Sequence, residues 1–261
     1  MKRVFLAALL AASCGGTTGS HLVSFQALAG GPADATGSAL TFSTQPPSGV
    51  TYQVRLTRTR LLVGAVYLNQ SVPASGSAAT GCVLPGIYVA EAFGPVTLDL
   101  LSPVLQPFPA FGEGTETPAR TAEVWLTSGD VNAPVDPTVI LDVAGTATAT
   151  QSGNSFPFQG TVTISANRAI PPVNPALPGS NPICKQRIVS PIFVDLTPTD
   201  GGTLTVRIDP RAMFQTVDFA TLQPASPGST TLLIPDTNAG AGQSLFKALV
   251  STAPYQFTWS P

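Results

Sequence analysis

The feature that most constrains the fold is a chain-long series of short strand-like runs separated by Gly, Pro, Asn and Asp. In "YQVRLT" (52–57) apolar residues alternate with polar ones, the period of two that is typical of a strand with one buried face. Related runs predict strands over 50–68, 86–93, 121–128, 138–150, 156–167 and 192–209, and a last one in "PYQFTWS". The pattern predicts an all-β fold, an antiparallel β-sandwich of immunoglobulin-like or related type with one or two short helices.

Turn residues indicate how some of these strands are joined. "SGN" (152–154) predicts a turn between two neighbouring strands, and Asp200-Gly201-Gly202 predicts a tight hairpin within 192–209.

Helix signals are scarce. Asp209 followed by Pro210 predicts a capped helical turn, and "SLFKALVS" (244–251) predicts a second short helix that begins at Ser244.

Composition indicates one folded body. Hydrophobic residues make up 43% of the 261 residues and the net charge is only −2, whereas disordered chains combine low hydrophobicity with high charge. The proline-rich stretch 170–182 is a possible domain linker. We interpret it as a long loop, because a predicted disulfide joins the segments on its two sides. Residues 22–261 are therefore predicted to form a single β-sandwich domain.

The amino terminus has the features of an export signal. Lys2 and Arg3 precede a short apolar run (4–10) and small residues, a pattern that predicts a cleaved signal peptide over 1–13. The sequence "LAASC" ending at Cys14 resembles the lipobox of bacterial lipoproteins. The resemblance implies that Cys14 is diacylated after cleavage. Gly15, in place of aspartate, resembles the sorting pattern for the outer membrane. Two or more acyl chains anchor a protein durably, and the Gly/Ser/Thr-rich residues 14–21 are predicted to form a flexible tether.

The remaining cysteines predict a disulfide. Cys82 and Cys184 are the only other thiols, and an exported protein enters an oxidising compartment. A bridge that closes a loop of about 100 residues stabilises the fold by up to about 4.7 kcal/mol in the chain-entropy model. Two free buried thiols are the alternative.

The sequence argues against most enzymes and against nucleic-acid binding. The only histidine is His21, in the predicted tether, whereas a catalytic triad needs an imidazole held rigidly. The G-x-S-x-G, P-loop and Rossmann motifs do not occur in the sequence. The chain is weakly negative and has no cluster of Lys and Arg that would bind the phosphate backbone of a nucleic acid. We predict a non-enzymatic protein that has no cofactor and does not bind nucleic acid.

Two loops contain candidate functional residues. Asp130, Asn132 and Asp136 place three side-chain oxygens within seven residues, and oxygen is the ligand that calcium prefers. Turn-forming Asx residues are the alternative interpretation. Glu113 and Glu116 lie in a Gly/Pro-rich loop, and paired carboxylates hydrolyse glycosides without histidine.

A further resemblance lies near the carboxyl terminus. Residues 204–214 ("LTVRIDPRAMF") and 217–219 ("VDF") resemble the closing segment of the methanobactin-associated copper-binding proteins, which implies an exported, β-rich protein. We predict a lipid-anchored cell-envelope protein, in the outer membrane or on the cell surface. Its expected role is non-catalytic binding or assembly with a protein or glycan partner. The alternatives are a small-ligand or calcium carrier at the envelope and a carboxylate-based hydrolase.

Overall fold

The computed structural model describes residues 20–71, 86–171, 174–176, 180 and 182–261. Strands dominate this part of the chain. They are β1 (Leu22–Gly30), β2 (Leu40–Thr44), β3 (Tyr52–Asn69), β4 (Tyr88–Asp99), β5 (Gln106–Pro107), β6 (Gly112–Thr115), β7 (Ala119–Trp125), β8 (Val139–Ala149), β9 (Ser155–Thr163), β10 (Ile188–Leu196), β11 (Thr203–Ile208), β12 (Gln223–Pro224), β13 (Leu232–Ile234) and β14 (Tyr255–Ser260). The helices are α1 (Gly240–Leu249) and four 3-10 helices: η1 (Ala166–Arg168), η2 (Ile183–Arg187), η3 (Pro210–Phe214) and η4 (Phe219–Thr221).

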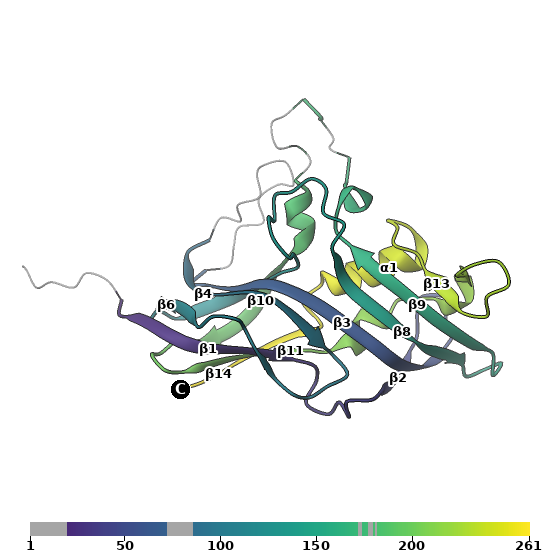
Figure 1. Ribbon diagram of the computed structural model, residues 1–261, viewed down its shortest axis with the longest axis horizontal. Helices are drawn as coiled ribbons and strands as arrows, with labels where there is room; N and C mark the ends of the chain where they lie inside the picture. Colours follow the sequence, from purple (N-terminus) through teal and green to yellow (C-terminus); the bar gives the residue numbers. More distant parts are fainter. Residues whose placement is uncertain (1–19, 72–85, 172–173, 177–179, 181) are drawn as a thin grey trace, which may run out of the picture.

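The strands form a mixed sheet that curls into a half-barrel (Figure 1). Its order is β12-β13-β9-β8-β3-β4-β6-β1-β11-β14, with β2, β5, β7 and β10 as side branches. The long strand β3 connects two halves of the sheet. The first part of β3 pairs with β2 and β8, and the last part pairs with β4 and β7.

Small side chains allow the tight curl around the end of β3. On the inner face, Leu68 lies opposite Ala90 of β4 and Ala122 of β7, and all three are buried. Gly112 of β6 lets the backbone approach the Phe25 ring closely, because a Cβ at this position would come within 2.3 Å of that ring. The inner face is therefore filled by a few large side chains set against alanine and glycine.

Aromatic side chains fill the core of the other half. Phe158 of β9 contacts Phe214 and Phe219, with ring centroids 5.8 and 4.9 Å apart. Tyr52 of β3 packs on Phe219 at 5.3 Å, and its hydroxyl donates to Asp218 at 2.6 Å. Helix α1 packs against η3 and η4 and closes this core.

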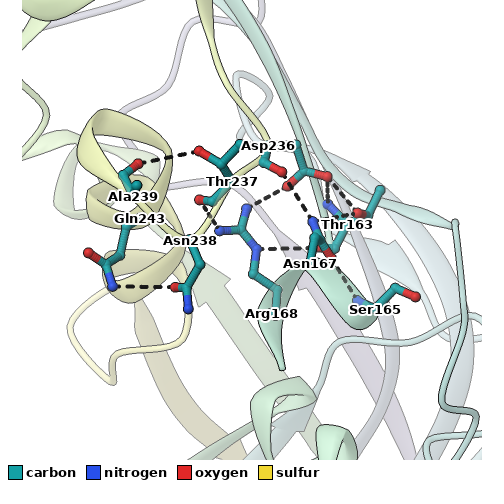
Figure 2. Close-up of polar contacts among 9 residues, drawn as sticks. All are labelled: Thr163, Ser165, Asn167, Arg168, Asp236, Thr237, Asn238, Ala239 and Gln243. Carbon is teal, nitrogen blue, oxygen red and sulfur yellow. Dashed lines mark hydrogen bonds and ion pairs between the residues drawn. The ribbon is translucent and has the colours of Figure 1, made fainter. Parts of the chain in front are cut away.

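A buried arginine joins η1 to the segment before α1 (Figure 2). Arg168 is 1% exposed. Its guanidinium pairs with Asp236 and donates to the backbone oxygens of Thr237 and Thr163, and it lies 4.5 Å from the Phe246 ring centroid. Thr163 also donates to Asp236. The cluster thereby connects the end of β9 to the start of α1.

The mostly-β class and most of the predicted strands are confirmed. The turn at 152–154 does join β8 to β9 as a hairpin. The fold itself differs from an antiparallel sandwich, because one curled sheet also contains the parallel pairs β1–β11 and β9–β13. The predicted hairpin at Asp200 is wrong: β10 pairs with β7, whereas β11 pairs with β1 and β14.

The helix predictions need smaller corrections. Asp209 does cap the turn before Pro210, accepting from the backbone N–H of Arg211, but the turn is a 3-10 helix. Helix α1 begins at Gly240, before Ser244, and has no side-chain cap. Among the described residues, no helix has the length and apolarity needed to cross a lipid bilayer. The predicted signal peptide, Cys14 and Cys82 lie outside the described residues.

Candidate functional site

A cleft of about 580 Å³ opens where β1, β4 and β6 meet. Three carboxylates line it, those of Glu91 in β4, Glu113 in β6 and Asp200 in the loop before β11. The apolar part of the lining includes Leu22 and Tyr88, which are 85% and 40% exposed. Neither lysine nor arginine occurs among the described residues that line it. The cleft therefore combines negative charge with apolar and aromatic surface.

Strand register places two of the cleft carboxylates, those of Glu91 and Glu113, in one row on the outer face of the sheet. Glu113 lies directly opposite Glu91, and Glu91 lies opposite Tyr67 of β3. Tyr67 in turn lies opposite Glu123 of β7. Side chains at directly opposed positions share a face, and their Cβ atoms are about 4.5–5.5 Å apart. The row thus runs Glu113, Glu91, Tyr67, Glu123 across four neighbouring strands.

Burial and neighbouring charges perturb the ionisation of Glu91 and Tyr67 in this row. Burial raises the pKa of Glu91, and the negative charge of Glu113 raises it further. Burial also raises the pKa of Tyr67, with the charges of Glu91 and Glu123 acting in the same direction. Like charges that are this close repel each other. A positively charged group in the cleft would relieve that repulsion.

Glu123, at the other end of the row, is fully buried. Its carboxylate accepts hydrogen bonds from Trp125 Nε1 at 2.9 Å, Asn69 Nδ2 at 3.1 Å and Tyr88 Oη at 3.5 Å. All three donors are neutral. Burial raises the pKa of Glu123, and these hydrogen bonds oppose the rise. Next to it, the amide oxygen of Asn69 is buried and has no hydrogen-bond partner in the described part of the chain.

Aromatic rings surround this end of the row. The centroid of Tyr67 lies 4.7 Å from that of Trp125, 5.2 Å from that of Tyr88 and 6.0 Å from that of Phe93. Phe93 is 48% exposed. Aromatic faces attract cations, most strongly where water is excluded. The aromatic cluster and the carboxylate row thus favour the same kind of ligand, an organic cation.

The predicted calcium residues form turns around a buried arginine. Asp130 accepts from the backbone N–H of Asn132 at 2.8 Å, and Asp136 accepts from that of Thr138 at 3.0 Å. Arg187 donates to the backbone oxygens of Asp130 and Val131. In the part of the chain that the structure describes, no group of three or more His, Cys, Asp or Glu side chains is arranged to hold a metal ion.

The predicted pair of glutamates is not brought together at the cleft. Glu113 lines it, whereas Glu116 does not, and the backbone N–H of Glu116 donates to His21. The carboxylate opposite Glu113 is that of Glu91. Sequence reasoning missed Glu91, Glu123, Asn69 and Tyr67. The only sequence signal for these residues was that they are polar or charged positions within predicted strands. Such positions are typical of a strand face that is exposed to solvent.

Cys184 is fully buried in a small cluster with Val131 and Ile188, against which Trp125 packs. Its predicted disulfide with Cys82 stays a prediction, because Cys82 lies outside the described residues. The last two residues of the predicted tether are hydrogen-bonded: Ser20 Oγ accepts from Thr117 Oγ1, and the backbone oxygen of His21 accepts from the backbone N–H of Glu116.

Comparisons with known proteins identify no family. No family model matches this chain, and no curated protein matches it. Among solved structures, MbnP from Methylosinus trichosporium is similar at 11% identity, with 93% of this chain and 99% of that chain covered. The TM-score is 0.34, and a likeness this weak carries no argument about fold or function. Any function assigned to the cleft therefore depends on the geometry of its residues.

Proposed function

We propose that this protein is a non-catalytic binding protein of the bacterial cell envelope, held to the membrane by acyl chains on Cys14. Its binding site is the acidic cleft, and its ligand is positively charged. The observation that carries the proposal is the direct opposition of Glu91 and Glu113 in a cleft whose described lining has no basic residue. Two carboxylates at such close range are destabilised when both are ionised, and a bound cation would compensate them.

A lysine homopeptide serves as a probe of this site. We expect calorimetry to show saturable binding to the soluble domain (residues 20–261) at low salt, because ionic contacts in an open cleft are screened by salt. Replacing Glu91→Gln and Glu113→Gln together should weaken binding about tenfold or more, since each charged hydrogen bond contributes about 1.5–3 kcal/mol.

The matched control is Glu116→Gln, which removes one negative charge close in sequence but outside the cleft lining. It should leave the affinity nearly unchanged. Equal losses in Glu116→Gln and in the cleft variant would mean that the probe senses net charge, and the cleft would lose its assignment.

Membrane attachment is tested at Cys14. In the bacterial host, the Cys14→Ser variant should move from the membrane fraction to the soluble fraction and should carry no label from fed palmitate, because stable anchoring requires two or more acyl chains. Cell fractionation with a membrane-protein marker checks the result. A Cys14→Ser protein that stays with the membranes as the parent does would overturn the anchoring proposal.

A further inference from the structure

We propose that the cationic ligand is a linear polyamine, which lies along the carboxylate row and places one ammonium group against Glu123 and Asn69. This inference rests on the proposed binding function and names its ligand class. It depends on residues of β3 and β7 that do not line the open cleft.

The spacing of the row matches a chain of separated positive charges. Neighbouring strands lie about 4.8 Å apart. One such interval separates Glu113 from Glu91, and two intervals, with Tyr67 between, separate Glu91 from Glu123. A linear polyamine carries protonated nitrogens joined by short methylene segments. It can present one charge to Glu91 and Glu113 and another to Glu123, while its methylene groups cover the Tyr67 ring.

At the Glu123 end of the row, its inner end, one buried acceptor has no hydrogen-bond donor among the described residues. The Asn69 side chain is fully buried, and its amide nitrogen already donates to Glu123. The amide oxygen of the same group, which therefore lies beside the carboxylate, accepts no hydrogen bond from the residues that the structure describes. A buried acceptor without a donor destabilises the structure. An ammonium group has three donors and one positive charge, and it would satisfy the Asn69 oxygen and the Glu123 carboxylate together.

Aromatic rings favour an organic ammonium group over a metal ion at this end. Tyr67 packs against both Tyr88 and Trp125, and the described side chains there offer oxygen ligands from Glu123, Asn69 and the Tyr88 hydroxyl. A hard metal ion needs six or more oxygen ligands, whereas an alkylammonium group gains from ring faces and methylene contacts.

Tyr88 separates the open cleft from the buried end. Its side chain is 40% exposed and lines the cleft, and its hydroxyl makes the longest of the three contacts to Glu123, at 3.5 Å. A hydrogen bond of that length is weak. Rotation of the Tyr88 ring would break this weak hydrogen bond and its packing on Tyr67, and on this proposal it is the movement that admits the ammonium group to Glu123.

The test compares two amines on the soluble domain (residues 20–261) by calorimetry. Spermidine is long enough to span the row, and trimethylenediamine reaches only the Glu91–Glu113 pair. We expect wild type to bind spermidine more tightly. The Glu123→Gln variant should lose about tenfold or more in spermidine affinity and should retain its affinity for trimethylenediamine. Spermidine, unlike trimethylenediamine, should also change the fluorescence of the wild-type protein, because Trp125 donates to Glu123.

The outcomes separate this inference from the proposed function. Unchanged spermidine affinity in Glu123→Gln, with no fluorescence change in wild type, would overturn the polyamine inference and leave cation binding at the cleft intact. If Glu123→Gln weakened binding of the lysine homopeptide as much as it weakened binding of spermidine, the inner end would be assigned to a lysine side chain. That result would also overturn the polyamine inference. Failure of all three probes to bind wild type would overturn the proposed function itself.

Discussion

Replacing Arg168 with alanine is expected to lower the free energy of unfolding by about 3–5 kcal/mol, the usual cost of removing one partner of a buried ion pair. The Arg168 side chain is completely buried in its pair with Asp236. Its loss would leave that carboxylate without its cationic partner and would remove the guanidinium donor from the backbone oxygens of Thr163 and Thr237. It would also remove the contact with the Phe246 ring and so loosen α1 from the end of β9.

Chemical denaturation followed by circular dichroism measures this effect. The matched control is Arg120→Ala, which removes the exposed pair with Asp195, whose side chains are 57% and 85% exposed. Exposed pairs contribute about 0–1 kcal/mol. Similar losses of stability in the two variants would show that the Arg168 cluster does not hold the carboxyl-terminal elements in place.

Replacing Glu123 with glutamine is expected to have the opposite effect and to stabilise the ligand-free protein near neutral pH. Burial raises the pKa of Glu123 above its ordinary value of 4.5, so the folded state binds this proton more tightly than the unfolded state does. Stability therefore falls as the pH rises from the ordinary value through the raised one. Glutamine carries no charge and avoids this loss, which amounts to about 1.4 kcal/mol for each unit of pKa shift.

Melting temperatures of the two proteins at several pH values test this expectation. The advantage of Glu123→Gln should be full above the raised pKa and should vanish below 4.5. Saturating spermidine should raise the melting temperature of wild type more than that of the variant, because a ligand stabilises the state that it binds. A variant that is less stable than wild type at every pH would mean that Glu123 is ionised without penalty.

Local structure could be predicted from the sequence where the pattern is local. The alternation in β3 and the turn between β8 and β9 are properties of neighbouring residues, and both predictions are confirmed. The curl of the sheet could not be predicted in this way. It depends on β1 pairing in parallel with β11, whose residues are far away in the chain. The glycines at 201 and 202 indicated a turn but not which strands would pair.

The site was harder to predict for a related reason. In "TAEVWLTS" the residues Thr121, Glu123 and Trp125 share a face, and this alternation is the same whether that face is solvated or buried. Only the packing shows that Glu123 is fully buried. Glu91 and Glu113 are brought together by the register between β4 and β6. Adjacency in sequence, which favoured Glu116 as the partner of Glu113, was the wrong criterion.

The central claim is that a cation binds between Glu91 and Glu113, and the pKa of Glu91 reports on it directly. Carbon-detected NMR of the glutamate carboxyl groups measures this pKa in the free protein and with saturating spermidine. In the free protein it should lie above 4.5, because burial and the charge of Glu113 both raise it. A bound cation favours the ionised form, so spermidine should lower the pKa of Glu91. A pKa that stays raised at saturation would contradict the account.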